Sequence, residues 1–241
     1  MRSSLEHDAG TLRNLSLASG MDLFAYRGDH VAERVGRALE REGIQDIDEL
    51  ARRVAGDDEA RSRFRRSVAM VVSGLFRDPA QFQLIERELL PMVMGARRQL
   101  RVWSAGCADG AELYSVGIVL AQLGILDEAS LLGSDLLEEN LMAAELGVYG
   151  DVQLPASLRA RMRWEQRDLL EAATPPGKWS LILCRNLAIY LRAHAKQLLH
   201  GRLAGALAAG GVLLLGRSER ITDPEGIGLE LVAPRAYRRV A

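Results

Sequence analysis

The sequence predicts a helical first part followed by a parallel α/β domain. Up to about Asp78 the chain shows helical apolar spacing and almost no strand signal, whereas from about Leu100 short apolar runs alternate with longer helical patterns. Such alternation is typical of a parallel sheet whose strands are joined by helices. We expect residues 1–78 to form an all-α domain, residues 79–98 a linker or helix, and residues 99–241 the α/β domain.

The first part is expected to be a small helical bundle. Val31, Val35 and Leu39 recur at three- and four-residue spacing, which indicates an amphipathic helix. Gly43 and Gly56 then divide the region into short helices.

A basic stretch lies within this bundle. Residues 58–66 carry four arginines around Phe64, namely Arg61, Arg63, Arg65 and Arg66. The stretch is either a solvated helix face or a docking surface for an acidic partner, which the near-neutral charge of the whole chain would hide.

The elements of the α/β domain follow from its apolar runs and the helical patterns between them. Strands are expected at Leu100–Ser104, Ser130–Ser134, Met162–Gln166, Trp179–Cys184 and Val212–Gly216. Helices are expected at Glu112–Leu123, Glu138–Leu146 and His194–Ala208. The tail Leu229–Val240, with Pro234 between two apolar stretches, suggests a closing hairpin.

Charge and composition narrow the class of protein. The 31 Lys plus Arg and 32 Asp plus Glu leave a net charge of -1, so we expect no nucleic-acid partner. The longest apolar runs are far shorter than the ~20 residues that a membrane-spanning helix needs, so we expect no membrane insertion. Two cysteines cannot build a disulfide framework and no signal peptide is visible, which together predict a cytoplasmic protein.

Several chemistries lack their motifs in this sequence. The histidines show no metal-ligand spacing and the two cysteines lie far apart, so no metal site is expected. Neither a P-loop nor a GxSxG nucleophile elbow is present, which removes the common routes of phosphoryl transfer and serine catalysis.

In an open parallel sheet, ligands bind beyond the carboxyl ends of the strands. The first strand is followed by a small-residue turn from Ser104 to Glu112, which lets the backbone approach a ligand and then opens a helix. Gly106 and Gly110 are four apart and no third glycine follows, so the GxGxxG pattern is missing. Asp135 ends the second strand roughly 25 to 30 residues beyond the turn, where such folds hold a ribose diol. The alternative role for Asp135 is to cap the next helix.

Polar residues also follow the fourth and fifth strands. Arg185 and Asn186 come directly after a run that should be buried on both faces of the sheet, and Gly216 leads to Ser218 and Glu219. These side chains either serve a ligand at this edge or cap the turns that follow.

Taken in order, the motifs resemble those of one family. They are Leu75-Phe76-Arg77-Asp78-Pro79, the stretch from Val102 to Glu112 with Tyr114-Ser115, Ser134-Asp135, Gly147-Val148-Tyr149, Cys184-Arg185-Asn186 with Ile189-Tyr190, and Gly210-Gly211 leading to Gly216 and Ser218-Glu219. The sequence resembles the CheR family of chemotaxis receptor methyltransferases over most of its length. The helical first part is similar to the family's N-terminal domain at Gly20-Met21-Asp22-Leu23 and Tyr26.

The resemblance implies a helical bundle followed by a Rossmann-like S-adenosylmethionine-dependent methyltransferase domain. Such an enzyme transfers a methyl group from S-adenosylmethionine to glutamate side chains and releases S-adenosylhomocysteine. The resemblance implies a chemoreceptor or another signalling protein as methyl acceptor, and we expect the protein to be a monomer.

The resemblance also implies roles for single residues. The cofactor would be bound by Ser73, Gly106, Glu112, Asp135, Asp168, Leu169, Arg185 and Asn186. Within this set, Asp135 would hold the ribose hydroxyls, and Asp168 and Leu169 would flank the adenine. Arg77 and Tyr190 would face the methyl group and the substrate carboxylate.

The sequence departs from the family pattern at cofactor contacts and in one longer segment. Val71 stands where the family usually has Asn, Ala111 replaces one of two glutamates, and Asp168 replaces an Asn. Fewer than twenty residues separate Tyr149 from Asp168, which leaves no room for the β-subdomain that many members insert there. Three functions stay open: a glutamate methyltransferase, a binding or regulatory module without useful turnover, and a methyltransferase of this fold with another acceptor.

Overall fold

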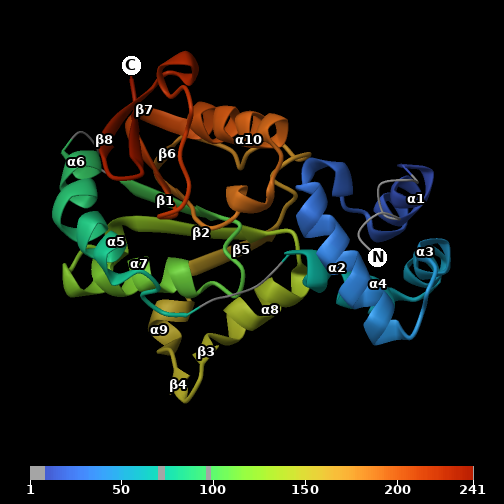
Figure 1. The fold of residues 1–241 in the computed structure, drawn as a ribbon. Coiled ribbons are helices and arrows are strands. Elements are labelled where there is room, and N and C mark those ends of the chain that lie inside the picture. The colour runs from blue at the N-terminus through green and yellow to red at the C-terminus, as the bar shows by residue number, and fades with distance from the viewer. Residues whose placement is uncertain (1–8, 70–73, 96–98, 241) are drawn as a thin grey trace. The chain divides into compact units, whose positions relative to one another are not determined.

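The computed structural model describes residues 9–69, 74–95 and 99–240. These residues form two compact units (Figure 1). The first unit holds residues 9–69 and 190–195, and the second holds the other described residues. Each unit has its own buried apolar residues.

The first unit is helical, as the sequence predicts. Its elements are α1 (Ala9–Ser19), the 3-10 turn η1 (Leu23–Ala25), α2 (Gly28–Glu42), α3 (Ile47–Gly56) and α4 (Asp58–Ala69). Gly43 follows α2 with a φ of 67°, a left-handed conformation that suits glycine at the end of a helix. Gly56 is the last residue of α3, so both predicted breaks fall at helix ends.

Apolar side chains from these helices form the core of the first unit. Leu15, Val35, Leu50, Val54 and Phe64 are each no more than 1% exposed. Buried residues recur at three- and four-residue spacing within these helices, as in Leu50, Ala51 and Val54 of α3 and in Ala60, Phe64 and Val68 of α4, so each of these helices has one buried stripe. Packing of these stripes accounts for most of the stability of short helices such as these.

Two arginines of the basic stretch, Arg61 and Arg63, form ion pairs within this unit. Arg63 of α4 forms ion pairs with Glu42 at 3.1 Å and Glu59 at 2.9 Å. Arg61 pairs with Asp58 at 2.6 Å. These pairs favour the solvated helix face over the docking surface, because local carboxylates already neutralise part of the positive charge.

A segment from the second half of the chain completes the first unit. Leu191 pairs with Tyr26 in an antiparallel bridge. Arg192 donates from its Nε to Tyr26 O and from its backbone N to Ala25 O, both at 2.8 Å. Residues 190–195 therefore belong with the helices by their contacts.

The second unit is built on a seven-stranded sheet. Its strands are β1 (Leu100–Ala105), β2 (Ala129–Asp135), β5 (Met162–Gln166), β6 (Trp179–Cys184), β7 (Leu207–Leu215), β8 (Leu229–Ala233) and β9 (Ala236–Arg239). The strand order is β5-β2-β1-β6-β7-β9-β8. The first five strands in this order are parallel, and the β8–β9 hairpin joins β7 antiparallel through β9. The parallel part has the doubly wound strand order of a Rossmann-like fold.

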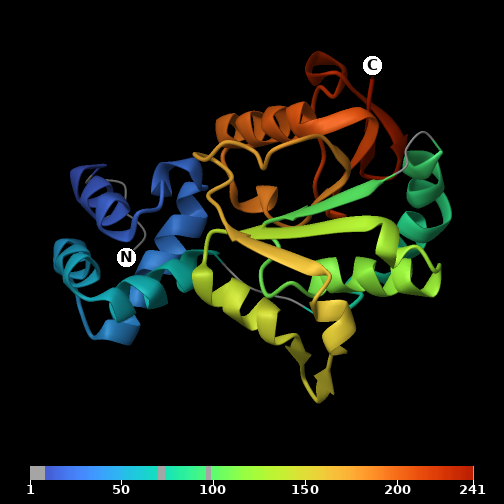
Figure 2. The same ribbon diagram turned by 180° about the vertical axis from the view of Figure 1, so that it is seen from behind.

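Helices cover both faces of this sheet (Figures 1 and 2). On one face lie α7 (Ala111–Gln122) and α8 (Glu138–Leu146), and on the other lies α10 (Ala193–Ala206). The run formed by α5 (Pro79–Leu84), the π-helical turn Ile85–Leu89 and α6 (Leu90–Met94) shares one apolar core with α7 and the sheet. The predicted parallel α/β class is therefore confirmed.

Most of the predicted elements of this sheet are confirmed. β5, β6 and α8 have the predicted bounds, and the tail forms the predicted hairpin. The largest errors lie at the junction of α10 and β7. Residues 207 and 208, predicted as the end of a helix, are strand, and β7 begins at Leu207, where it pairs with Trp179, instead of at the predicted Val212. The Ala- and Gly-rich run at this point has no periodicity that separates helix from strand.

The segment between α8 and β5 is short, as predicted. β3 (Val148–Tyr149) and β4 (Val152–Gln153) form a two-stranded antiparallel sheet, and α9 (Ala156–Arg159) follows. The structure describes every residue between α8 and β5, and no three-stranded subdomain is present there.

One histidine of α10 is buried. His200 is 5% exposed, and its Nε2 has no hydrogen-bond partner. Burial, together with the nearby charge of Lys196, lowers the pKa of His200 to about 4. The folded protein therefore keeps this side chain neutral at pH 7, whereas an unfolded chain binds the proton near the ordinary histidine pKa of about 6.5.

The free energy of unfolding is expected to fall as the pH drops from 6.5 toward 4, because the unfolded state gains a proton at His200 that the folded state does not. Between pH 7 and pH 5 this histidine should account for about 2 kcal/mol. Urea unfolding of His200→Leu beside the unaltered protein measures this contribution, since the variant lacks it. Equal pH slopes for the two proteins would contradict the expectation.

Candidate functional site

The polar residues that follow the parallel strands lie at one edge of the sheet, because parallel strands end at the same edge. β1 is followed there by a turn, residues 106–110, that leads into α7. Gly106 N and Cys107 N both donate to Ser134 O, at 2.8 and 2.9 Å. These hydrogen bonds hold the start of the turn against the end of β2.

Left-handed backbone at three positions shapes this turn. The φ angle is 77° at Gly106, 50° at Ala108 and 82° at Gly110. A Cβ at position 110 would lie 2.5 Å from Cη2 of Trp164, and one at position 106 would lie 3.2 Å from Cδ2 of Leu187. Glycine is thus required at position 110, while Ala108 keeps a strained conformation that costs about 1–3 kcal/mol.

Asp135 connects this turn to the start of α8. Its side chain is buried; Oδ2 accepts from Ala108 N at 2.9 Å, and Oδ1 accepts from Leu137 N at 3.0 Å and from Asn140 Nδ2 at 2.9 Å. Burial raises the pKa of the Asp135 carboxyl, and these donors act in the opposite direction. The N-cap residue of α8 is Leu137, so Asp135 supports the helix start without being its N-cap.

Glu112 lies in the first turn of α7 and is held from two sides. Its Oε1 accepts from the Ser104 hydroxyl at 2.7 Å, and its Oε2 pairs with Nη1 of Arg185 at 3.1 Å. The side chains of Glu112 and Arg185 are 15% and 4% exposed, so this ion pair is largely withdrawn from water.

The guanidinium of Arg185 also reaches the segment before α5. Its Nε donates to Gln81 Oε1 at 2.8 Å, and its Nη2 donates to Arg77 O at 2.8 Å. The same Nη2 donates to Asp78 Oδ2 at 3.2 Å. With Nη1 on Glu112, all three nitrogens have partners, so the side chain links the end of β6 to α7 and to α5.

The main chain around Arg77 is fixed, while its side chain is exposed. The flanking residues Phe76 and Asp78 have φ angles of 53° and 61°, in the left-handed region that non-glycine residues rarely adopt. Phe76 N donates to Ser115 Oγ at 2.8 Å. Such strain is typical of functional segments that the surrounding structure holds in place.

Glu219 holds the turn that carries Asn186. Its Oε2 accepts from Asn186 N at 2.7 Å and from Gly216 N at 2.8 Å, and its Oε1 accepts from Ile189 N at 3.3 Å. Glu219 is 4% exposed, and Asn186 has a φ of 61°. The hydrogen bonds of the Glu219 carboxylate therefore stabilise the strained turn directly after β6.

Of the two residues predicted to flank the adenine, Leu169 lies beside the glycine turn. A Cβ at Gly106 would lie 3.8 Å from Cδ1 of Leu169. Asp168 Oδ1 accepts from Leu170 N at 2.8 Å, and Leu169 O accepts from Nη1 of Arg202 at 3.2 Å. Leu169 thus lies where a ligand on the turn would meet an apolar side chain.

Two predicted site residues are not among those gathered in the second unit. Ser73, like Val71, lies outside the described residues. Tyr190 belongs to the first unit, where its ring centroid lies 4.8 Å from that of His30 and its carbonyl accepts from Arg27 N at 2.9 Å.

The sequence pattern does not point to several residues that hold the site. Gln81 and Arg202 lie on helices and belong to no recognisable motif, although Gln81 is 6% exposed and so is a buried polar side chain on an apolar helix face. Glu219 belongs to a motif that the sequence analysis names, but its partners Asn186 N and Ile189 N could not be predicted from that motif. A buried carboxylate or amide needs partners, but the sequence does not say which residues supply them.

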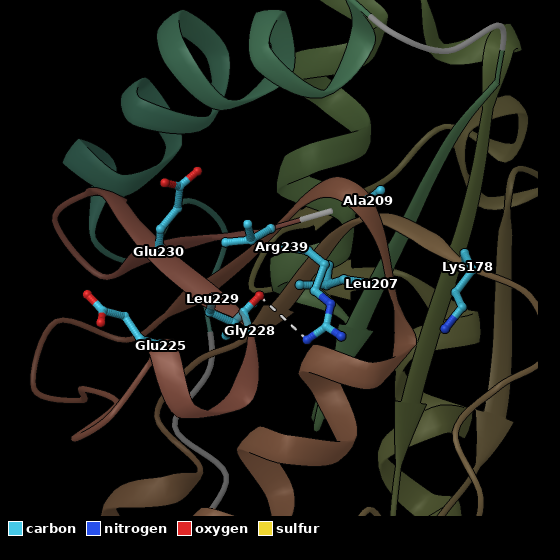
Figure 3. Close-up of a pocket in the computed structure, with 9 residues that line it drawn as sticks. Lys178, Leu207, Ala209, Glu225, Gly228, Leu229, Glu230 and Arg239 are labelled. Atoms are coloured by element: carbon cyan, nitrogen blue, oxygen red, sulfur yellow. Dashed lines mark hydrogen bonds between the residues drawn. The ribbon is translucent and has the colours of Figure 1, made fainter.

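A pocket of ≈ 690 Å³ opens elsewhere on the second unit (Figure 3). Lys178 precedes β6, Leu207 begins β7 and Arg239 ends β9, and all three line it. Lys178 and Leu207 mark the amino ends of the parallel strands β6 and β7, and the end of β9 lies at the same edge because β9 runs antiparallel to β7. The pocket therefore lies at the edge of the sheet opposite to the predicted site residues.

Neither a metal cluster nor a membrane span is found in the part of the chain that the structure describes. Within it, no three His, Cys, Asp or Glu side chains are grouped so that they could hold a metal ion. None of its helices combines the length and the apolar character needed to cross a membrane. The edge of the sheet where the parallel strands end, called the carboxyl edge below, instead presents carboxylates, a guanidinium and backbone N–H groups.

Known proteins resemble this chain over most of its length. The chain matches the family described as CheR methyltransferase, SAM binding domain, over residues 72–157 and 150–230. A chemotaxis protein methyltransferase of Listeria innocua is 28% identical over 232 residues, which cover 87% of this chain and 88% of the relative. Chemotaxis protein methyltransferase 1 of Pseudomonas aeruginosa is 28% identical over 228 residues, covering 80% and 82%.

The similarity to a solved structure is weaker than the similarity to these sequence relatives. The TehB-like SAM-dependent methyltransferase of Corynebacterium glutamicum aligns with a TM-score of 0.46 and 17% identity, covering 76% of this chain and 97% of that one. The fold assignment therefore rests on the strand order of the sheet itself.

The doubly wound sheet and the family match together define an S-adenosylmethionine-dependent methyltransferase. S-adenosylmethionine is its cofactor, as the resemblance to this family implies. The chain belongs to the CheR methyltransferase family. This membership does not favour the alternative of a binding module without turnover.

Proposed function

We propose that this chain is a protein-glutamate O-methyltransferase that acts on chemoreceptors or related signalling proteins. The observation that carries the proposal is the similarity to chemotaxis protein methyltransferases, which extends over 87% of this chain for the relative from Listeria innocua. The carboxylates and the guanidinium at the carboxyl edge of the sheet supply suitable binding chemistry.

The residues at this edge fit S-adenosylmethionine by their chemistry. The backbone at Gly106 lies close to the apolar side chains of Leu169 and Leu187, where an added Cβ would crowd them. The carboxylates of Asp135 and Glu112 suit hydroxyl groups and positive charges, both of which the cofactor carries. We propose that Asp168, Arg185 and Asn186 also contact this cofactor. Ser73, which lies outside the described residues, is proposed as a further contact. When bound, the cofactor supplies an electrophilic methyl group on a sulfonium sulfur.

The proposed reaction needs no general base. A glutamate side chain has an ordinary pKa of about 4.3, so the acceptor is already an anion at pH 7. Its oxygen forms a bond to the methyl carbon as the bond from that carbon to sulfur breaks, and S-adenosylhomocysteine is released. The protein must align the two reactants, a contribution of about 7–11 kcal/mol in favourable cases.

Arg77 is the residue that we propose to orient the acceptor carboxylate. Its carbonyl is held by Arg185, and its side chain is exposed. A guanidinium binds a carboxylate through two parallel hydrogen bonds, which fixes direction as well as distance. We propose Tyr190 as a further residue that contacts the acceptor protein.

Replacing Arg77 with alanine is expected to leave the affinity for S-adenosylhomocysteine within about twofold and to lower kcat/KM for methyl transfer by about 10- to 100-fold, the usual loss for a charged hydrogen bond. Arg77→Lys, which keeps the charge but not the paired donors, should recover part of the rate. Calorimetric titration and a transfer assay measure the two effects. Loss of cofactor binding in Arg77→Ala would place this residue in the cofactor pocket instead.

Transfer of a radiolabelled methyl group from S-adenosylmethionine into membranes that contain candidate chemoreceptors tests the proposed acceptor. Label in the receptor that base releases is the sign of a glutamyl ester and would support the proposal. Base-stable label, or label in other proteins only, would indicate another acceptor, an outcome favoured by the short segment between α8 and β5. Binding of S-adenosylhomocysteine without transfer to any acceptor would indicate a binding module.

We also propose that the protein acts as a monomer in the cytoplasm. Cys107 and Cys184 are both buried and free, and burial raises the pKa of both thiols. Free thiols of this kind are typical of a reducing compartment. Light scattering of the purified protein distinguishes the monomer of 26.5 kDa from a dimer.

A further inference from the structure

We propose that Tyr149 is a positioning residue that holds the cofactor-binding turn through its hydroxyl group. Tyr149 Oη donates to Asp109 O at 2.5 Å, across 40 positions of sequence. Tyr149 lies on β3, whereas Asp109 lies inside the turn between β1 and α7. The inference concerns cofactor binding and does not depend on which acceptor the enzyme methylates.

The turn needs such a partner because its backbone is strained. Ala108 has a φ of 50°, and a non-glycine residue keeps this conformation only when its surroundings fix it. On one side, Asp135 accepts from Ala108 N and Ser134 accepts from Gly106 N. On the other side, Tyr149 donates to the carbonyl of the residue that follows Ala108. The hydroxyl therefore fixes the turn between Ala108 and Gly110.

Tyr149 is itself well placed to hold a carbonyl. Its ring is half-buried and packs edge-on against Tyr114, with centroids 6.0 Å apart and an interplanar angle of 72°. Burial, reinforced by the nearby Asp109 carboxylate, raises the pKa of Tyr149 above its ordinary value. The hydroxyl thus keeps its proton and remains a donor at physiological pH.

The neighbouring Tyr114 provides a matched control. Its Oη donates to Ala144 O at 2.8 Å, and its ring is fully buried beside Tyr149. Ala144 lies on α8 and not in the turn. Tyr149→Phe and Tyr114→Phe therefore each delete one phenol-to-carbonyl hydrogen bond from the same cluster, but only the first deletes a contact to the cofactor-binding turn.

Calorimetric titration with S-adenosylhomocysteine and urea unfolding of both variants test the proposal. Tyr149→Phe is expected to lower the affinity for S-adenosylhomocysteine by about three- to tenfold. Tyr114→Phe is expected to lower the urea midpoint while its affinity stays within about twofold of the unaltered protein. Hydrogen exchange should accelerate at residues 106–110 in Tyr149→Phe and at the end of α8 in Tyr114→Phe.

Equal losses of affinity in the two variants would overturn the proposal, because they would show a general loss of stability. Unchanged affinity in Tyr149→Phe would also overturn it. If the unaltered protein fails to bind S-adenosylhomocysteine, the cofactor sites and the role of Tyr149 fall together. If it binds this product but esterifies no glutamate, only the proposed acceptor is wrong, and the comparison of the two variants still decides the role of Tyr149.

Discussion

Replacing Asp135 with alanine is expected to weaken binding of S-adenosylhomocysteine by about tenfold or more, the loss typical of a charged hydrogen-bond partner. Two effects add. The variant loses the carboxylate proposed for the ribose hydroxyls, and it leaves Ala108 N, Leu137 N and the Asn140 amide without their acceptor. Calorimetric titration of the purified variant measures the change.

Asn140→Ala is the control for this variant. It removes one donor to the Asp135 carboxylate but keeps the negative charge and the bond to Ala108 N. A loss of about threefold or less is expected. Should Asp135→Ala bind as tightly as the unaltered protein, the carboxylate would be a structural tie between the glycine turn and α8, and the ribose assignment would be lost.

Arg185→Met is expected to lower the free energy of unfolding by about 3–5 kcal/mol, the usual cost of removing one partner from a buried ion pair. The variant leaves the Glu112 carboxylate, 15% exposed, without its guanidinium. It also frees Gln81 Oε1 and Arg77 O, which Arg185 now satisfies. Urea unfolding with a two-state fit measures the loss.

A double-mutant cycle separates the ion pair from the other contacts of Arg185. Glu112→Gln combined with Arg185→Met should cost less than the sum of the two single variants, because no unpaired buried charge remains. Arg185→Lys keeps a charge for Glu112, but its donors all lie on one nitrogen and cannot replace the separate nitrogens that bind Gln81 and Arg77, so an intermediate loss is expected. If the losses of unfolding free energy in the two single variants sum to the loss in the double variant, Glu112 and Arg185 do not act as a pair.

The strands could be predicted where apolar runs have clear ends. The run Trp179–Cys184 is uninterrupted and stops at a charged residue, so its bounds as β6 follow from the sequence. The junction between α10 and β7 could not be predicted, because the residues around Leu207 are Ala, Leu and Gly, which suit helix and buried strand alike. Pairing of Leu207 with Trp179, a contact made only in the folded sheet, decides the boundary.

The place of the candidate site could be predicted, but most of its internal contacts could not. Parallel strands end at one edge, so Asp135 and Arg185 are expected there from their positions alone. Which side chains bind one another at this edge cannot be predicted in the same way. Arg185 binds Gln81 across 104 positions and Glu219 binds Asn186 across 33, and neither spacing belongs to a local pattern. Side-chain direction and packing of whole elements determine these contacts.

The bridge between Tyr26 and Leu191 makes the helical unit discontinuous in sequence. A nascent chain cannot complete this unit when its helices emerge from the ribosome, since Leu191 and Arg192 are synthesised only after most of the sheet. Exchange of residues 1–78 alone between relatives would likewise separate Tyr26 and Ala25 from their native partners Leu191 and Arg192. Neither unit corresponds to a contiguous block of sequence, so cutting the chain at one point cannot separate the two units intact.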